Sequence, residues 1–357
     1  MEESDRKFMR RALALAARAA GRTSPNPLVG AVIERDGAIV GEGYHHASGE
    51  PHAEVEALRA AGERARGATM YVTLEPCAHH GQTPPCVDAI REAGVARVIA
   101  ALRDPNPRVD GRGFRALRDA GISVEQGLLA DEAARLNEGF LTRIREGRPF
   151  VLVKIATTVD GRVAVAGRRY LVGKRALREV HRLRDRYDAV LVGVGTVLAD
   201  DPALTVREVR GRDPLRVIVD SDARTPPTAK VVRARDPQRT MVLVARDADT
   251  RRVNRLRESG VLLATMPRDP RGGLDLGAAL RWLGEQGVNT VLSEAGPRVA
   301  ASLVRAGLAD RVLFLIAPIV GGGGAPALAD APTALELRDP RSRRLGEDVA
   351  IEGYLRP

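Results

Sequence analysis

Three side chains that bind metal ions readily constrain the fold of this chain more than any other feature. They are His52 and the only two cysteines, Cys77 and Cys86. Imidazole and thiolate are typical ligands of zinc, and three of them leave one of its four coordination positions open. Zinc with an open position can activate a water molecule for attack on a carbon centre. The chain must therefore fold so that these three side chains meet at one point.

Glu54 lies two residues after His52 and is the candidate proton carrier of such a site. On a continuous helix these two side chains would point about 200° apart, so only the first turn of a helix can bring both towards one metal. Pro51 suits that first turn. A His-x-Glu sequence followed by Pro-Cys and a second cysteine is the signature of zinc deaminases that act on cytosine- or adenine-like rings. Here the second cysteine follows after eight residues rather than two.

A structural zinc site is the alternative interpretation of the same residues. His79 or His80, in the loop after Cys77, could supply the fourth protein ligand that a closed site needs. A structural site has no use for Glu54, however, and the segment between the cysteines is richer in glycine and proline than a zinc finger. We therefore favour the catalytic interpretation and predict that Glu54 does not bind the metal.

The length and charge of the chain set its broad class. At 357 residues it is long enough for about two domains. The formal charge of +10 comes almost wholly from arginines, which are scattered through predicted helices. Aromatic residues make up only 3% of the chain, which offers little for stacking nucleic-acid bases. We interpret the basic charge as solvated helix faces and expect neither nucleic acid nor a membrane as partner.

Cysteine usage and the N-terminal segment predict a cytoplasmic protein. Both cysteines belong to the metal pattern, so none is left for a disulfide framework, which fits a reducing compartment. The first five residues include acidic side chains, and no long apolar run follows them. We therefore expect neither a signal peptide nor a membrane span.

The first part of the chain alternates strand and helix patterns, which is typical of an α/β layer sandwich. A helical stripe over 5–20 comes first, and a tight Asp36-Gly37 turn then predicts a β-hairpin. A helix over 51–61 and a short buried strand over 70–74 carry the first two metal ligands into place. Further elements are expected in the order helix, strand, helix and strand at 87–93, 97–102, 114–120 and 123–126.

Longer motifs surround the metal-binding residues. They are Asn26-Pro27, Gly41-Glu42-Gly43-Tyr44-His45, Gly49-Glu50-Pro51-His52-Ala53-Glu54, Tyr71-Val72-Thr73-Leu74-Glu75-Pro76-Cys77, Thr83-Pro84-Pro85-Cys86 and Asp104-Pro105-Asn106-Pro107. Together they resemble the deaminase half of the bifunctional riboflavin-biosynthesis deaminase/reductases. The cysteine spacing and the last motif favour this family over the similar cytidine and transfer-RNA adenosine deaminases. The resemblance implies a cytidine-deaminase-like, three-layer α/β/α domain over residues 1–145.

The same resemblance implies roles for individual residues. The implied zinc site consists of His52, Cys77 and Cys86, with Glu54 as the proton carrier. Asn26, His45 and Asn106 would face the pyrimidine and its sugar. Asparagine next to proline also forms turns unaided, so a purely structural role of Asn26 and Asn106 stays open. Family members often carry a basic residue at the position of Gln82, so a phosphate contact from that loop is open as well.

The second part of the chain predicts another α/β domain. The charged segment 143–149 is the expected linker. The apolar run 150–155 after it is typical of a strand covered on both faces. Later strands are expected at 189–194, 215–219, 241–245, 261–264, 290–293 and 312–317, with helices at 174–183, 250–258, 276–285 and 297–306. If these strands are parallel, they need crossover helices.

Glycine-containing turns in this part are candidate phosphate sites. The junction Glu294-Ala295-Gly296-Pro297 leads from a strand into a helix, whose free backbone N–H groups would favour a phosphate. An ordinary turn with Pro297 at the first helical position explains the same sequence. The run 321–324 permits either close backbone approach or a flexible loop. Gly193-Val194-Gly195-Thr196 lacks the third glycine of a Rossmann fingerprint and is a weak signal.

Motifs in this part extend the resemblance to the reductase half of the same family. They are Lys154, Asp160-Gly161-Arg162, the segment 195–207, Val219-Asp220-Ser221 and Glu294-Ala295-Gly296-Pro297. The resemblance implies an α/β domain over residues 146–357, similar in fold to dihydrofolate reductase. It implies NADPH contacts near Ala156, Thr196, Asp200, Ser221 and Gly296. It implies substrate contacts near Lys154, Arg184, Leu204, Arg207 and Glu294.

Two details of this half leave the substrate contacts open. Arg184 and Arg207 suit a sugar phosphate, because the guanidinium fork matches phosphate oxygens, but surface arginine is common in this chain. Arg168 and Tyr170 stand where the family often has a serine and a tryptophan. The nicotinamide and substrate contacts of that loop are therefore not fixed by the resemblance.

The resemblance covers nearly the whole chain and predicts a bifunctional enzyme of riboflavin biosynthesis. The first domain would hydrolyse the ring amino group of 2,5-diamino-6-ribosylamino-4(3H)-pyrimidinone 5′-phosphate at zinc, and the second would reduce the ribosyl group to ribityl with NADPH. We expect a small-molecule substrate and a homo-oligomer. Two rival hypotheses are a deaminase of RNA or transfer RNA with an appended binding module, and a zinc-stabilised binding protein without enzymatic activity.

Overall fold

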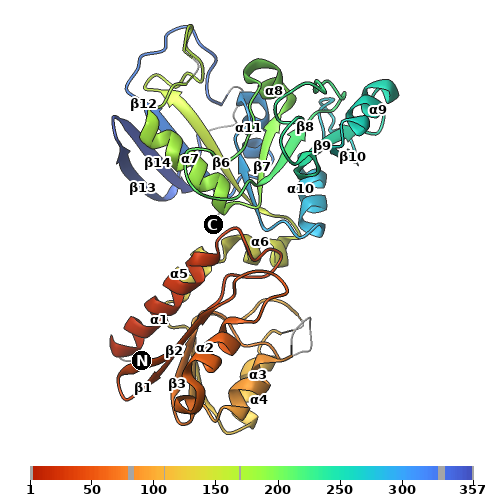
Figure 1. Cartoon of the computed structure of the whole chain (residues 1–357). Coiled ribbons are helices and arrows are strands. Elements are labelled where there is room, and N and C mark those ends of the chain that lie inside the picture. Colours follow the sequence, from red (N-terminus) through yellow and green to blue (C-terminus); the bar gives the residue numbers. More distant parts are fainter. Residues whose placement is uncertain (1–2, 79–83, 108, 169, 329–333, 356–357) are drawn as a thin grey trace. The chain divides into compact units, whose positions relative to one another are not determined.

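The computed structural model describes residues 3–78, 84–107, 109–168, 170–328 and 334–355 (Figure 1). The chain divides into two compact units, Met1–Gly147 and Arg148–Pro357. Each unit has its own sheet and its own hydrophobic core, and each is described by itself. Among the described residues, the helices are all too short or too polar to cross a bilayer.

The first unit is built on a five-stranded sheet in the order β2-β1-β3-β4-β5. The strands are β1 (Gly30–Arg35), β2 (Ala38–Tyr44), β3 (Thr69–Val72), β4 (Arg97–Ala100) and β5 (Ser123–Gln126). The helices are α1 (Glu3–Ala16), α2 (Ala53–Ala61), α3 (Cys86–Glu92), α4 (Arg112–Asp119), α5 (Ala130–Leu136) and α6 (Glu138–Glu146). The pairs β3/β4 and β4/β5 are parallel, whereas β1 runs antiparallel to both of its neighbours.

Alternating side chains divide the core of this unit between the two faces of the sheet. Ala31 and Ile33 of β1 pack with α2, α3 and α4 on one face. Val32, between them, packs with α1 and α5 on the other. This alternation follows from the two-residue period of a strand and confirms the predicted three-layer α/β/α arrangement.

The hairpin and the metal-bearing helix show how local sequence sets the local structure. Asp36 and Gly37 both have positive φ, 54° and 79°, as the predicted tight turn between β1 and β2 requires. The prediction that a helix starts at Pro51 is wrong by two residues. His52 is extended, with φ −74° and ψ 159°, and forms the N-cap of α2, which starts at Ala53.

Strand directions bring four connecting segments to one edge of this sheet. The parallel strands β3 and β4 both end there. Because β1 is antiparallel to them, it begins at this edge, where Gly30 pairs with Tyr44 at the end of β2. The segments before β1 and after β2, β3 and β4 therefore meet, and they contain every substrate and metal residue predicted for this unit.

The second unit contains a nine-stranded sheet in the order β10-β9-β8-β7-β11-β6-β12-β14-β13. The strands are β6 (Phe150–Thr158), β7 (Ala189–Gly193), β8 (Leu215–Val219), β9 (Thr240–Ala245), β10 (Leu262–Met266), β11 (Thr290–Ser293), β12 (Arg311–Ala317), β13 (Arg338–Leu345) and β14 (Asp348–Tyr354). The helices are α7 (Lys174–Arg186), α8 (Val194–Asp200), α9 (Thr250–Glu258), α10 (Leu276–Glu285) and α11 (Pro297–Arg305).

In the order given, the seven strands from β10 to β12 are parallel to one another, whereas β14 is antiparallel to both β12 and β13. Helices cover both faces of the sheet. Val151 and Val153 of β6 pack with α10 and α11 on one side, and Leu152 packs with α7 on the other. This confirms the prediction that the apolar run is a strand buried on both faces. Helices α7 to α11 supply crossovers of the kind that parallel strands need.

The boundary between the two units, at Gly147 and Arg148, falls within the segment 143–149 that was expected as the linker. The segment 143–149 is not a free linker, since α6 continues to Glu146 and ends at Gly147, whose positive φ of 70° caps it. Arg148 is buried against Asp310, with two hydrogen bonds of 2.6 and 2.8 Å between their side chains. The helix α8 and the hairpin formed by β13 and β14 were not expected.

Candidate active sites

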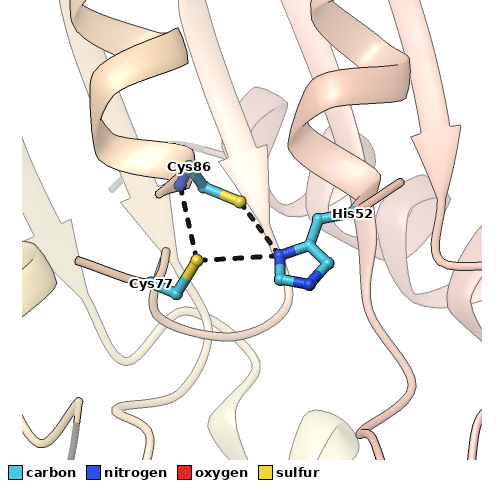
Figure 2. A group of neighbouring side chains, drawn as sticks. All are labelled: His52, Cys77 and Cys86. Carbon is cyan, nitrogen blue, oxygen red and sulfur yellow. Dashed lines mark hydrogen bonds between the residues drawn. The ribbon is translucent and has the colours of Figure 1, made fainter. Parts of the chain in front are cut away.

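The three predicted metal ligands converge at the edge of the first sheet where the four connecting segments meet (Figure 2). His52 caps α2, Cys77 lies in the segment after β3, and Cys86 is the first residue of α3. The Nδ1 atom of His52 lies 3.1 Å from the Cys86 sulfur and 3.6 Å from the Cys77 sulfur. All three ligand atoms lie within 4.8 Å of one another. Within the described ranges, the cluster consists of these three residues, and Glu54 is not one of them.

These separations fit a single tetrahedral zinc ion. Sulfur and nitrogen atoms that share one zinc are about 3.6 Å apart, given Zn–S and Zn–N bonds of about 2.3 and 2.1 Å. Hydrogen bonds from Cys86 and His52 lower the pKa of the Cys77 thiol, which favours the thiolate that metals bind. His79 and His80, the possible fourth ligands of a closed zinc site, lie outside the described residues. So does Gln82, at whose position family members often carry a basic residue.

Glu54 sits beside the cluster as a buried carboxyl group. It is the second residue of α2, and only 3% of it is exposed. Burial raises its pKa, although the charge of His52 opposes the shift. A carboxyl group with a raised pKa can both take and give a proton near neutral pH, which is the property that a general acid–base needs.

Asn26 and His45 form a hydrogen-bonded pair next to the cluster. The ring of His45 meets that of His52 edge-on, with centroids 5.4 Å apart. Its Nδ1 donates to the Pro51 carbonyl oxygen at 3.1 Å, so its Nε2 is free to accept from the Asn26 amide at 3.0 Å. Burial lowers the pKa of His45, consistent with this neutral form. The ring thereby fixes which way the Asn26 amide points.

Asn106 is held in its loop by Asp104, a residue of the same motif for which no role was predicted. Its backbone N–H donates to Asp104 at 2.8 Å, and burial raises the pKa of Asp104 to about 6. Glu75, two residues before Cys77, accepts backbone hydrogen bonds from the same loop and from the start of α4. A Cβ atom at Gly113 would lie 1.9 Å from the Pro76 carbonyl oxygen, so only glycine permits this approach.

Asn137 supports the segment that carries Asn26. Its side-chain amide accepts from the Leu28 N–H at 2.8 Å and donates to the Leu28 carbonyl at 2.9 Å. Asn137 is 2% exposed and lies at the junction of α5 and α6. No spacing in the sequence connects these two distant positions, so this contact was not predictable.

In the second unit, Glu294 is the centre of a buried charge cluster. It follows β11 and accepts two hydrogen bonds from the Arg184 side chain, at 2.6 and 3.1 Å. The Lys154 ammonium lies 3.2 Å from the same carboxylate. Burial alone would raise the pKa of Glu294, but the charges of Arg184 and Lys154 outweigh it and hold the pKa at about 2. The structure thus brings together three of the five predicted substrate residues.

His181 links Arg207 to this cluster and is a second residue that the sequence did not reveal. Its Nδ1 accepts from the Arg207 backbone N–H at 2.9 Å. Burial and the charges of Arg184 and Arg207 lower the pKa of His181 to about 4. The Arg207 guanidinium is exposed and donates to the Thr205 hydroxyl at 2.6 Å. Leu204, nearby in sequence, is buried with a positive φ of 55°.

The predicted cofactor residues lie in segments that meet at the C-terminal edge of the parallel strands. Thr196 of α8 accepts a hydrogen bond from the Gly296 N–H at 3.2 Å. Gly296 is the N-cap of α11, so the predicted strand-to-helix junction is confirmed. Ala156 lies in β6, Asp200 ends α8 and Ser221 follows β8. Ligands of open α/β sheets bind at this edge.

The glycine run 321–324 is held against the segment after β6. Asp160 accepts from the N–H groups of Gly321 and Gly322 at 2.7 and 2.9 Å. A Cβ atom at Gly324 would lie 2.3 Å from the Ala164 carbonyl oxygen. The glycines therefore permit close backbone approach, one of the two expected alternatives.

Two family models match the chain, one in each unit. The model described as the cytidine and deoxycytidylate deaminase zinc-binding region matches residues 2–102. The model described as the RibD C-terminal domain matches residues 149–351. The first includes all three metal ligands and Glu54, and the second includes every cofactor residue predicted in the second unit.

Relatives match over nearly the full length. The riboflavin biosynthesis protein RibD of Escherichia coli is 44% identical, covering 97% of this chain and 98% of that protein. A solved structure of Acinetobacter baumannii RibD superposes with a TM-score of 0.88 at 38% identity and 99% coverage of both chains. A diaminohydroxyphosphoribosylaminopyrimidine deaminase/5-amino-6-(5-phosphoribosylamino)uracil reductase from Thermotoga maritima gives 0.86 at 35% identity, again with 99% coverage of both.

These matches decide between the hypotheses drawn from the sequence. They confirm the predicted zinc deaminase and reductase of riboflavin biosynthesis. They do not favour the RNA deaminase with an appended module, because the relatives align along both halves of the chain. A binding protein without enzymatic activity is set aside for the same reason.

Proposed function

The chain belongs to the RibD family, and we propose on that basis that it deaminates 2,5-diamino-6-ribosylamino-4(3H)-pyrimidinone 5′-phosphate and then reduces the ribosyl group of the product. The first unit would carry out the hydrolysis and the second the reduction. The observation that carries the proposal is the cluster of His52, Cys77 and Cys86 beside a buried carboxyl group that is not one of its members.

In the deaminase site, the protein holds the metal and moves the protons. His52, Cys77 and Cys86 would hold zinc, which supplies a Lewis acid with an open position for water. Glu54 takes a proton from the attacking water and passes it to the departing amino group, so that ammonia leaves and a ring carbonyl forms. Its raised pKa supports this double role.

Asn26 and Asn106 are proposed to recognise the substrate of this site. The amide of Asn26 is oriented by His45, and the loop of Asn106 is held by Asp104. Asparagine offers both a donor and an acceptor, which suits a pyrimidine edge or a sugar hydroxyl. We assign His45 to positioning, because both of its ring nitrogens are engaged by the protein.

In the reductase site, the buried charges are proposed to orient the open-chain sugar. NADPH supplies the hydride when bound, and Thr196, Gly296, Ala156, Asp200 and Ser221 are the residues proposed to hold it. Lys154 and Glu294 present a fixed pair of opposite charges to the ribosylamino group. The fork of Arg184 already faces Glu294, so we propose that Arg184 fixes this carboxylate and that the exposed Arg207 contacts the phosphate.

Cytoplasmic location and a homo-oligomeric state remain proposals. The location rests on cysteine usage, since both cysteines belong to the metal cluster and none is left for a disulfide framework.

The test of the proposed deaminase chemistry is the Glu54→Gln variant. Glutamine keeps the size of the side chain but cannot carry the proton, so ammonia release should fall by at least about a hundredfold. Bound zinc, measured by atomic absorption, and NADPH oxidation with the deaminated substrate should stay at wild-type values. Glu56→Gln is the matched control, since Glu56 lies on the same helix but pairs with Arg59 at 2.9 Å. Ammonia release that persists in Glu54→Gln would show that Glu54 is not the proton carrier.

A further inference from the structure

An arginine-lined pocket lies in the second unit, outside the residues considered so far. Its cavity measures about 380 Å³ and is open to solvent on one side. Its lining includes Leu198, Ala223, Arg224, Thr225, Arg252 and Arg255. The arginines come from the segment after β8 and from α9, the helix that follows β9. The pocket therefore sits at the C-terminal ends of two adjacent parallel strands.

The walls of this pocket belong to the segments that carry proposed cofactor residues. Leu198 lies on α8 midway between Thr196 and Asp200. Ala223 follows Ser221 by two residues in the turn after β8. A dinucleotide held by Thr196, Asp200 and Ser221 would therefore extend one end towards this pocket.

The arginines of the pocket are available for an anionic ligand. Arg224 and Arg255 take part in no ion pair within the described part of the chain. The Arg252 guanidinium makes a long contact of 3.5 Å with the Asp222 backbone carbonyl, and its charge contributes to lowering the pKa of Asp249 without a direct ion pair in the described part of the chain. Guanidinium groups match phosphate oxygens in shape and charge.

The two carboxylates at the end of β8 and in the turn after it are engaged elsewhere. In dinucleotide-binding α/β folds, an acidic residue near the end of a strand binds the ribose 2′-hydroxyl of NAD, whereas an arginine accommodates the 2′-phosphate of NADP. Asp220 ends β8 but is fully buried, and one of its oxygens accepts both the N–H and the hydroxyl of Thr225, at 2.6 and 2.7 Å. Asp222 is paired with Arg268 at 2.8 Å. A ribose diol would find the first carboxylate buried and the second paired with an arginine.

We propose that Arg224, Arg252 and Arg255 bind the 2′-phosphate of NADPH and thereby set the preference of the reductase for NADPH over NADH. This inference rests on the proposed reductase function and adds to it the residues that read the 2′-phosphate. The pocket volume of about 380 Å³ leaves room for the phosphate and part of the adenosine.

The experiment compares two probes that differ only in the 2′-phosphate, adenosine 2′,5′-bisphosphate and adenosine 5′-monophosphate. Each is titrated calorimetrically into the full-length protein and into Arg224→Ala, Arg252→Ala and Arg255→Ala. Each variant should bind the bisphosphate about tenfold more weakly, as expected for loss of one charged contact, and the monophosphate unchanged. Arg251→Ala is the matched control, because Arg251 is exposed on the same helix but does not line the pocket. This control should bind both probes like the wild type.

The possible outcomes separate this inference from the proposed function. Variants that keep the full preference for the bisphosphate, or that weaken both probes equally, would overturn the inference. Oxidation of NADPH by the wild type with the deaminated substrate is measured alongside. If the wild type binds the bisphosphate no better than the monophosphate yet oxidises NADPH, the inference fails and the reductase proposal stands. If NADPH is not oxidised at all, the reductase proposal fails whatever the arginine variants bind.

Discussion

Glu75 offers the sharpest test of how the deaminase site is held together. Its carboxylate is 4% exposed and lies two residues before the metal ligand Cys77. It accepts four backbone hydrogen bonds, from Gly113 at 2.9 Å, Gly111 at 3.0 Å, and Asp104 and Phe114 at 3.3 Å. One side chain thus ties the segment of Cys77 to the loop of Asn106 and to the start of α4. The informative change is Glu75→Gln, which keeps the shape and removes the charge.

The size of the effect follows from counting donors. Each carboxylate oxygen accepts two N–H groups, and glutamine replaces one oxygen with an NH₂ group that cannot accept. Two buried N–H groups then lose their acceptor, at about 1–3 kcal/mol each, and the other two lose a charged partner. Because the four bonds share one group, these costs are not additive. We expect the loop over 104–114 to lose about 3 kcal/mol of local stability, which corresponds to roughly a hundredfold faster opening.

Amide hydrogen exchange followed by mass spectrometry measures this opening directly. Peptides that cover 104–114 should exchange roughly a hundredfold faster in Glu75→Gln, while peptides of the second unit should not change. Glu92→Gln is the control, since Glu92 is an exposed glutamate on α3 of the same unit. If the loop exchanges within threefold of the wild-type rate, this carboxylate does not hold it, and the assignment of Glu75 as a positioning residue is refuted.

Two further predictions concern the buried charges of the second unit. Glu294→Gln leaves two buried cations facing a neutral amide and should cost about 3–5 kcal/mol of unfolding free energy. Urea unfolding followed by the fluorescence of Trp282, the only tryptophan, reports this unit alone. His181 has an ordinary pKa near 6.5 when unfolded and about 4 when folded, so only the unfolded chain binds its proton between these values. Stability should therefore fall from pH 6.5 to 4, by about 3 kcal/mol, and His181→Gln should lack this loss.

Each of these predictions has an outcome that contradicts it. For Glu294→Gln, the control is Glu347→Gln, because Glu347 is an exposed glutamate of the same unit. Equal urea midpoints for Glu294→Gln and this control would mean that the charge cluster contributes nothing net. For His181, the wild type and His181→Gln could instead lose the same stability between pH 6.5 and 4. That result would show that other groups cause the acid sensitivity.

Hydrophobic patterns predicted most of the elements that bury side chains and missed an edge strand that buries almost none. The strands β8 and β11 and the helices α9 and α10 have the expected bounds, because apolar residues form a run in these strands and recur at helical spacing in these helices. The strand β13 was missed, since its residues are mostly charged and all but the last are exposed at the edge of the sheet. No burial pattern exists there for a sequence to show.

The metal ligands could be predicted because their chemistry is rare in the chain, whereas their supports could not. Two cysteines and a histidine in order have few explanations, and the structure brings them within 4.8 Å. Glu75 and Asn137 are ordinary residues whose partners are distant in sequence, 36 and 109 positions away in the contacts to Gly111 and Leu28. Only the meeting of chain segments at one sheet edge gives these side chains their roles.

The two units use buried glutamates for opposite purposes, and the difference lies in the surrounding charges. Burial raises the pKa of Glu54, although the charge of His52 opposes the shift, so its carboxyl group can exchange a proton. Glu294 is equally buried, but Arg184 and Lys154 hold its pKa at about 2 and keep it ionised. The charges around the second carboxylate thus keep it ionised, whereas burial shifts the first towards its protonated form. The residue type alone could not separate the proton carrier from the fixed anion, because each role is set by neighbours that the fold supplies.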